Sequence, residues 1–290
     1  VIALTLVAAI GSAVYALQLQ NVYKAEALLL PPIAKKIQSM DVIGLQNRLD
    51  AQTGIIIGSK INPTDVLAIF KQNIKSRTVH KKFIQEYGLM ELLAPGKPSD
   101  TLDLPIYAGF AGMIKLGDEN GLTSLSIEMT DGEIAAQLVN NLIKFVDKET
   151  ISMLVKDLKD SIQSRVEDIG YTIKSKRLMA ERRREDQIIQ YTENAEIAKK
   201  LGIIGRLDIA TATTPLYYLG YEALMTEISV LRARKSDDPF IGGLRNLQEE
   251  LALLRTIKFD TEKMSAVHID QAAYYNKNHI KPNRRLIVSI

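Results

Sequence analysis

The chain has no cysteine and no tryptophan among its 290 residues, and only 6% of its residues are aromatic. Without cysteine there can be no disulfide, no thiolate nucleophile and no zinc–thiolate site, although the redox compartment stays open. The chain also lacks an excess of charge of one sign, because its 37 basic and 34 acidic residues leave a net charge of only +3. A nearly balanced charge gives no electrostatic argument for nucleic acid as the main partner. The hydrophobic content of 46% allows one or two ordinary folded cores.

Motifs of catalysis, metal binding and cofactor binding are also missing. The histidines, His80, His268 and His279, have no H-x-x-x-H spacing, so we expect them to be structural or on the surface. The segment Gly54–Lys60 (G-I-I-I-G-S-K) has one residue too few between its glycines for a phosphate loop, and a serine precedes its lysine. We therefore predict no catalytic residue, no metal site and no cofactor, and infer that the chain is not an enzyme.

Long apolar runs stand at the two ends of the chain. Residues 1–19 carry no charge and approach the roughly 20 residues that span a bilayer, so they predict a first, partial transmembrane helix. A buried core helix and a cleaved signal peptide remain alternatives. Residues 280–290 end in L-I-V-S-I and predict the start of a second transmembrane helix, next to four residues that we expect to be membrane-proximal: Lys281, Pro282, Arg284 and Arg285.

A single long helix is predicted from Thr130 to Gly202. Thr130 and Glu133 fit a capping box at its start, and Gly202 fits a stop. At 1.5 Å per residue, about seventy helical residues reach roughly 105 Å, several times the diameter of a compact domain. We therefore expect the helix to project and to pack along one narrow apolar stripe: Ile151, Val155, Leu158, Ile162, Val166, Ile169 and Ile173.

Shorter elements surround the long helix in the sequence. Val22–Leu30 predicts a strand that the following prolines stop, and residues 33–87 favour helices. Residues 111–116 and 122–129 predict a β-hairpin around a five-residue turn, G-D-E-N-G. After the long helix, residues 216–235 predict a helix whose expected apolar face is Leu219, Ala223, Thr226 and Val230. Residues 240–257 predict another, with the face Leu244, Leu247, Leu251 and Leu254, and Ala266–Tyr275 predicts a strand beside the first one.

These elements predict an α+β membrane protein. Its small mixed α/β base would carry a very long helical hairpin as a protrusion, and two transmembrane helices would flank the whole. The predicted boundaries are listed in chain order: first transmembrane helix 1–19, α/β base 20–130, long helix 131–203, distal turn and descending helices 204–257, return strand 258–279, and second transmembrane helix 280–290.

A dense cluster of charges occupies the second half of the long helix, between Lys174 and Asp186. One interpretation is a solvated surface with the pairs Arg177–Glu181 and Arg182–Asp186, each worth a few tenths of a kcal/mol. Another is contact with a neighbouring subunit, and a third is binding of a glycan or a diphosphate, which arginine suits. The candidate oligomer or glycan contacts are Arg177, Arg182, Arg183 and Arg184.

Several segments together resemble the Wzz chain-length determinants, the polysaccharide co-polymerases of the bacterial inner membrane. They are the terminal apolar run, the strand ending in prolines (Y-K-A-E-A-L-L-L-P-P), the very long helix, and T-T-P-L-Y-Y-L-G-Y-E-A-L-M-T-E-I-S-V-L at Thr213–Leu231. Lys281–Pro282 matches the family's membrane-proximal region, although the proline-rich run common there is reduced to one proline.

The resemblance implies a periplasmic α/β base with a helical protrusion, anchored by two transmembrane helices in the inner membrane. It also implies ring-like homo-oligomers that control the modal length of the O-antigen of lipopolysaccharide made by the Wzy polymerase. The implied partners are other copies of the chain, the Wzy polymerase, an undecaprenyl-linked glycan and membrane lipid. No catalytic residues come with the family.

Two other classes combine a membrane anchor with a helical periplasmic domain. A periplasmic adaptor of an export system also carries a helical hairpin, but normally between lipoyl-like β halves, and no pair of glycine-rich strand clusters flanks this one. A periplasmic sensor domain is also bracketed by two spans. Both remain alternatives to the chain-length regulator.

Overall fold

The computed structural model describes residues 19–40, 62–97, 104–119, 121–207 and 215–282. The chain divides into two compact units. The first unit takes in the chain up to Lys159 and again from Phe259 onward, and the second is Asp160–Lys258. Helix α8 (Gly132–Lys200) contributes its first part to the first unit and the rest to the second.

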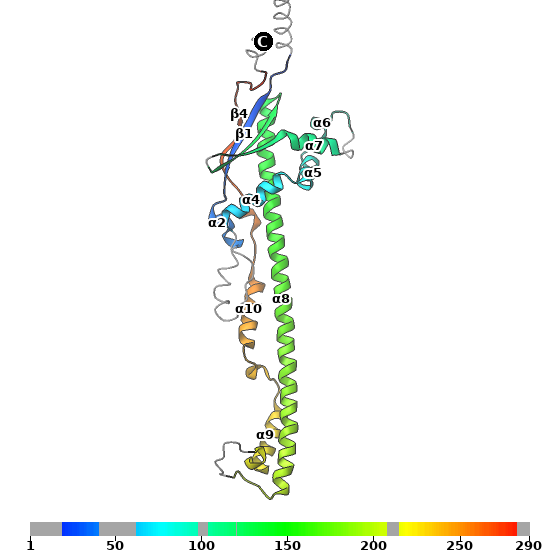
Figure 1. The fold of residues 1–290 in the computed structure, drawn as a ribbon, viewed down its shortest axis with the longest axis vertical. Helices are drawn as coiled ribbons and strands as arrows, with labels where there is room; N and C mark the ends of the chain where they lie inside the picture. Colours follow the sequence, from blue (N-terminus) through cyan, green and yellow to red (C-terminus); the bar gives the residue numbers. More distant parts are fainter. Residues whose placement is uncertain (1–18, 41–61, 98–103, 120, 208–214, 283–290) are drawn as a thin grey trace, which may run out of the picture. The chain divides into compact units, whose positions relative to one another are not determined.

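The first unit contains a four-stranded antiparallel sheet in the order β2-β3-β1-β4 (Figure 1). Its strands are β1 (Tyr23–Leu30), β2 (Ile114–Glu119), β3 (Leu122–Met129) and β4 (His268–Tyr275). Alternate residues of β1 are buried, as expected for a strand with one face on the core: Ala25, Ala27 and Leu29. The predicted first strand and the return strand beside it are confirmed.

The buried face of this sheet shares one hydrophobic core with the beginning of α8. Short helices complete the unit: α2 (Ala34–Ile37), η1 (Gln38–Met40), α4 (Pro63–Ile74), α5 (Arg77–Glu86), α6 (Met90–Leu93), α7 (Leu104–Met113) and η4 (Thr261–Lys263). Pro63 begins α4, where its missing N–H leaves no bond unmade. Phe83 of α5, Phe110 of α7 and Phe145 of α8 contact one another through Phe83, with ring centroids 5.8 and 5.4 Å apart.

Two polar residues of α8 hold the returning chain against the helix. The Asn140 amide donates to the carbonyl of Ala273 (3.0 Å) and accepts from the N–H of the same residue (2.8 Å), as a neighbouring strand would. The Asp147 carboxylate accepts from the N–H of Ala266 at 2.6 Å and from the hydroxyl of Ser265 at 3.2 Å. Burial raises the pKa of Asp147, and these hydrogen bonds oppose the rise.

The ends of α8 show one confirmed signal and one error. At the start, the Asp131 carboxylate accepts from the N–H groups of Glu133 (2.9 Å) and Ile134 (3.0 Å). The predicted capping box of Thr130 and Glu133 is therefore wrong, because Asp131 is the cap. At the end, Gly202 adopts φ 70° and its N–H bonds to Lys199, while the next N–H bonds to Ala198, which is a Schellman motif.

The predicted hairpin is also corrected in its turn. Residues 111–113 belong to α7, and β2 continues through Gly117 to Glu119, which pairs with Leu122. The loop is therefore shorter than the predicted five residues. Gly121 adopts φ 81°, as a tight hairpin turn requires.

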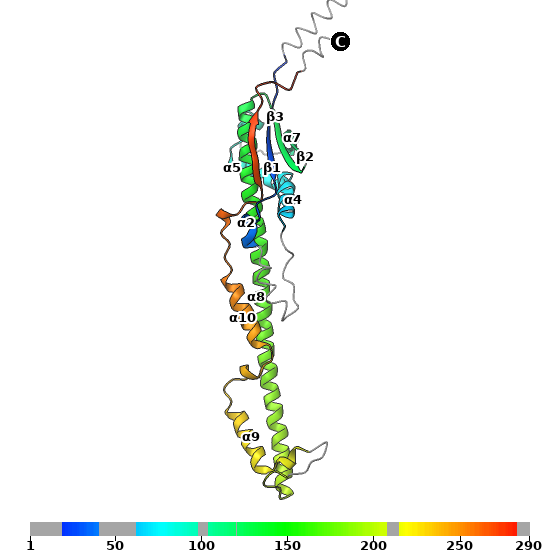
Figure 2. The same cartoon turned by 90° about the vertical axis from the view of Figure 1, so that its left-hand side faces the viewer.

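In the second unit, α9 (Tyr221–Ala233) and α10 (Leu244–Thr256) lie along α8, with η2 (Leu216–Leu219) before α9 and η3 (Asp238–Phe240) between the two helices (Figure 2). The predicted stripe of α8 is confirmed, since all seven of its residues are buried or half-buried. The predicted face of α10 is likewise buried or half-buried, although the helix begins only after Gly243, at φ 74°. The sequence thus identified the packing face of α10 and that of α8, whose residues Ile151, Val155 and Leu158 belong to the first unit.

The predicted face of α9 is wrong. Gly220, at φ 86°, begins the helix, and the N–H of Tyr221 bonds to the carbonyl of Ile203, which fixes the rotation of the helix. The residues turned inward are Leu224, Ile228 and Leu231, while Ala223, Thr226 and Val230 are exposed. Both faces have helical spacing, so the sequence alone did not decide between them.

No helix within the described ranges is long and apolar enough to cross a membrane. Residues 1–18 and 283–290, which carry nearly all of the two predicted spans, lie outside those ranges. Where the flanks meet the first unit, the N–H of Val22 donates to the carbonyl of Lys281 at 2.9 Å, and the N–H of Ile280 donates to the carbonyl of Val22 at 2.8 Å. The two flanking segments are therefore adjacent at residues 22 and 281.

Candidate functional site

The charged segment of α8 lies on the face of the helix that packs in the second unit. After Ile173 the three-and-four spacing continues through Lys176, Ala180 and Arg184, and all three are half-buried. The packing stripe therefore changes from apolar to polar without leaving its face. Because the partner of this segment is the connection between α9 and α10, the charges meet groups about sixty residues away in sequence.

Arg177 and Asp238 form a two-point ion pair. Arg177 donates from Nε to Asp238 Oδ1 at 2.9 Å and from Nη2 to Oδ2 at 2.7 Å. This hydrogen bonding lowers the pKa of Asp238 and raises the pKa of Arg177. The Arg177 side chain is half-exposed and that of Asp238 half-buried, so solvent still reaches the pair and screens its attraction. The pair serves mainly to fix the position of η3.

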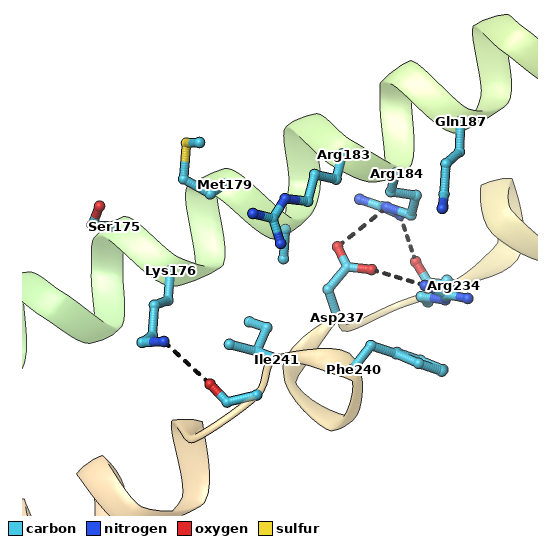
Figure 3. Close-up of a pocket in the computed structure, with 12 residues that line it drawn as sticks. Ser175, Lys176, Met179, Arg183, Arg184, Gln187, Arg234, Asp237, Phe240 and Ile241 are labelled. Carbon is cyan, nitrogen blue, oxygen red and sulfur yellow. Dashed lines mark hydrogen bonds and ion pairs between the residues drawn. The ribbon is translucent and has the colours of Figure 1, made fainter. Parts of the chain in front are cut away.

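Arg184 and Arg234 converge on one carboxylate, Asp237 (Figure 3). The distances are 3.2 Å from Arg184 Nε to Oδ2 and 3.4 Å from Arg234 Nη1 to Oδ1. Arg184 also donates to the carbonyl of Arg234 at 3.1 Å, and the Arg234 guanidinium lies 3.9 Å from the centre of the Phe240 ring. Cation–π contact and ion pairing together hold the chain where α9 ends.

These contacts enclose an open groove of about 490 Å³ between α8 and the α9–α10 connection. Lys176 bounds it on one side, where its ammonium group donates to the carbonyl of Gly242 at 3.1 Å. The groove has basic, aromatic, apolar and amide groups on its walls: Ser175, Lys176, Met179, Ala180, Arg183, Arg184, Gln187, Arg234, Asp237, Phe240, Ile241 and Gly242.

The candidate residues named from the sequence separate into two kinds. Arg177 and Arg184 are used within the chain, in the contacts to Asp238 and Asp237. Arg182 and Arg183 are exposed, and no carboxylate of the described chain forms an ion pair with either. The predicted pairs Arg177–Glu181 and Arg182–Asp186 are likewise not among the ion pairs of the described residues. Arg177 instead pairs with Asp238, which lies on another element.

At the other predicted site, Lys281 binds the sheet. Its ammonium group lies 2.8 Å from Glu128 Oε2, and Lys115 also pairs with Glu128. The two lysines, Lys115 first, lower the pKa of Glu128. Pro282 follows Lys281 at the limit of the described residues, and the predicted membrane-proximal Arg284 and Arg285 lie outside them.

A buried ion pair between α8 and α10 escaped the sequence analysis. Arg165 Nη2 lies 2.7 Å from Glu250 Oε1, and the two side chains are only 15% and 2% exposed. Glu250 occupies the position between Leu247 and Leu254 on the apolar face of α10, so its place on that face was a readable signal. A charge there needs an opposite charge across the interface.

The described residues hold no group of three or more His, Asp or Glu side chains placed to bind a metal. His80 is buried in the first unit, where its Nε2 lies 2.5 Å from the carbonyl of Ile74 and its ring meets Phe110 edge to face. Burial lowers the pKa of His80, and the hydrogen bond to Ile74 opposes this shift. Its contacts make His80 a structural residue of the first unit.

Fold and site together define a class of protein: an antiparallel α+β unit and a helical unit that share one 69-residue helix, whose charged face is used for packing. The model of the family described as "Wzz: Chain length determinant protein" matches residues 1–87. No curated protein sequence matches the chain.

Solved structures with the same fold include a "full-length bacterial polysaccharide co-polymerase", with a TM-score of 0.64 at 17% identity over 99% of this chain and 87% of that one. The wild-type Shigella flexneri lipopolysaccharide O-antigen chain-length regulator WzzBSF gives a TM-score of 0.58 at 17% identity, over 88% of this chain and 100% of that one. A Wzz dodecamer fitted to a cryo-EM map gives 0.54 at 15% identity, over 90% and 99%. At such identities the likeness establishes the fold, and with the family match it confirms the resemblance to the Wzz family.

Proposed function

We propose that this chain regulates the chain length of O-antigen as a Wzz-type polysaccharide co-polymerase without catalytic activity of its own. The observation that carries the proposal is the shared fold over 99% of the chain with a full-length polysaccharide co-polymerase, joined to the family match at residues 1–87. The charged contacts of α8 support it, because they are structural pairs and a groove rather than an acid, a base and a nucleophile within reach of one another.

The pairing of Val22 with Lys281 supports anchoring at both ends in one membrane. Because these residues are hydrogen-bonded to each other, the flanking segments 1–19 and 280–290 would leave the first unit side by side. We propose that both are transmembrane helices in the bacterial inner membrane and that the two units lie in the periplasm. The boundaries predicted from the sequence, with the base at 20–130 and the long helix at 131–203, remain part of this proposal.

The exposed side of α8 supports assembly into a ring. Apolar side chains there are open to solvent in the single chain: Tyr171, Leu178 and Ile189. Exposed apolar groups on one element are typical of interaction surfaces, and a relative has been described as a dodecamer. In a ring of this chain, Arg182 would also face neighbouring copies, while Arg183, which lines the groove, would face the glycan. The ring would act as a scaffold for the Wzy polymerase and its undecaprenyl-linked glycan next to membrane lipid.

Deletion of the gene and complementation test the function directly. The deletion strain is expected to lose the modal length of its lipopolysaccharide O-antigen, and the plasmid-borne gene is expected to restore it, as read from ladders on a silver-stained gel. Identical ladders in the presence and absence of the gene would disprove chain-length control.

Charge reversal at Arg182 tests the assembly. We expect Arg182→Glu to disrupt oligomers in nanodiscs, measured by cross-linking and mass photometry, because one exposed charge would change its sign in every interface. Lys156→Glu is the control, since it also reverses the charge of an exposed basic side chain on α8. A wild-type protein that gives only monomers and dimers would refute the ring.

A further inference from the structure

The groove between α8 and the α9–α10 connection has an excess of positive charge. Four basic side chains line it, and Asp237 is the one carboxylate among its described lining residues. Asp237 is already shared by Arg184 and Arg234, and Lys176 is bonded to a carbonyl group. The positive potential is therefore only partly compensated within the chain.

Arg183 is the basic group of the groove whose guanidinium has neither an ion pair nor a hydrogen bond among the described residues, whereas Lys176, Arg184 and Arg234 each have one. It lines the groove, and Figure 3 shows its guanidinium between Met179 and Asp237, on the side of α8 that faces Ile241. Its neighbours Arg184 and Lys176 are held by hydrogen bonds and so cannot turn away from it. A fixed set of cations around one unpaired guanidinium is the arrangement that binds an oxyanion, because arginine presents parallel N–H donors.

The remaining walls suit a ligand with a ring and hydroxyl groups. Phe240 lines the groove and is 67% exposed, and the guanidinium of Arg234 holds it in place. Ser175 and Gln187 add a hydroxyl and an amide at opposite ends of the groove, about 18 Å apart along α8, where each can exchange hydrogen bonds with hydroxyls of a different sugar of a glycan. The volume of about 490 Å³ lies within the roughly 300–1,000 Å³ typical of small-molecule sites.

We propose that this groove binds an acidic sugar residue, with Arg183 holding its carboxylate or phosphate and Phe240 contacting the apolar face of its ring. The choice of a sugar rests on the proposed function in polysaccharide assembly. The choice of an acidic group rests on the charges of the groove alone. The site would let the second unit hold a glycan at a defined position.

Isothermal titration calorimetry on the full-length protein in nanodiscs tests the proposal, with sodium glucuronate, glucose 6-phosphate, inorganic phosphate and glucose as separate probes. We expect saturable binding of glucuronate or glucose 6-phosphate that is tighter than that of phosphate, and no binding of glucose. Arg183→Gln is expected to raise the dissociation constant at least about tenfold, since a charge-assisted contact is lost. Arg232→Gln, at an exposed arginine of α9 that does not line the groove, is expected to leave the dissociation constant unchanged.

Binding of inorganic phosphate as tightly as either acidic sugar would overturn the assignment of a sugar, and equal binding of glucose would overturn the role of the charge. No binding of any probe, or equal losses in the two variants, would also overturn the proposal. These binding results are independent of the lipopolysaccharide ladder. If the wild-type gene restores the ladder but its protein binds none of the probes, only the proposed site is refuted. If the wild-type gene does not restore the ladder, the proposed function is refuted.

Discussion

The two units hold the same helix by different means. In the first unit, α8 is embedded in a continuous apolar core that includes the sheet and the aromatic residues of α5 and α7. In the second, a small apolar cluster near the end of α8 is separated from Ile173 by a stretch in which the interface consists of ion pairs. Apolar burial is insensitive to salt and specific only in shape, whereas charge pairs fix register and weaken as salt screens them.

This difference teaches that one helix can have unequal stability along its length. The first unit should unfold at the free energy of the whole domain, while α9 and α10 should open locally at lower cost, because few buried apolar contacts hold them. Hydrogen–deuterium exchange along α8 would measure the difference. The following substitutions and pH changes test this difference in stability, in order from the largest expected effect to the smallest.

Phe83→Ala should give the largest loss. Phe83 is fully buried among Phe110, Phe145 and Tyr87, so truncation leaves a cavity and should lower the free energy of unfolding by roughly 3–5 kcal/mol. Chemical denaturation followed by circular dichroism measures the change. Tyr171→Ala is the control in the second unit: its side chain is 72% exposed, so the change should stay within about 0.5 kcal/mol. Equal effects would contradict the contrast between the units.

Breaking the buried pair of the second unit should come next. Glu250→Leu leaves Arg165 without its carboxylate in a mostly buried place and should destabilise the packing of α10 by roughly 3 kcal/mol. Because an apolar pair can replace a buried ion pair, Arg165→Met added to Glu250→Leu should recover most of this loss. Exchange rates of α10 amides give the readout. If the amides of α10 exchange faster in the double variant than in Glu250→Leu alone, the ion pair stabilises the packing by more than the mutual neutralisation of its two buried charges.

The stability of the first unit should depend on pH through His80. Burial lowers the pKa of His80 in the folded chain below its ordinary value of 6.5, so the unfolded chain takes up the proton first. The contribution is complete above about pH 6.5 and is lost as the pH falls toward the lowered pKa, by at most about 1.4 kcal/mol per pH unit. Denaturation midpoints between pH 7.5 and 5 measure it. The denaturation midpoint should depend less on pH in His80→Gln than in the wild type. An unchanged dependence in that variant would mean that other titrating groups cause it.

Arg177→Ala should have the smallest effect. The Arg177 side chain is 51% exposed, so solvent screens its attraction to Asp238. Loss of the pair should slightly raise the exchange of amides in η3 and leave the unfolding midpoint nearly unchanged. The pKa of Asp238 is lowered by Arg177, so the pair contributes above the ordinary pKa of an aspartate and is lost as the pH falls through the lowered one. High salt should remove the difference between variant and wild type. A large loss that persists in salt would mean that Arg177 also packs.

Much of this architecture follows from local rules. Pro31 stops the first strand, Gly202 ends the long helix, and the spacing from Ile151 to Ile173 identifies the face that packs. Each of these signals acts within a few residues, through a missing N–H, a positive φ or the helical period. One of the errors is also local. Asp131 rather than Thr130 caps the helix, because either of two adjacent polar residues can accept the same N–H groups.

Nonlocal pairing was not readable in this way. The charges of α8 predicted near neighbours, yet Arg177 and Arg184 bind Asp238 and Asp237 from the α9–α10 connection. The face of α9 depends on where Gly220 begins that helix against residues 203 and 204. Sequence spacing states which residues share a face, but it does not state which face meets a partner.

The sequence by itself therefore determined the strands, the unbroken length of α8 and the stripe along it, since propensity, caps and periodicity are properties of neighbouring residues. Only the tertiary structure decided which arginines are used within the chain, which one lines the groove without a carboxylate partner, and that Glu250 is buried with Arg165. The physical reason is that the energy of a charge depends on the burial and the partners that other segments bring to it.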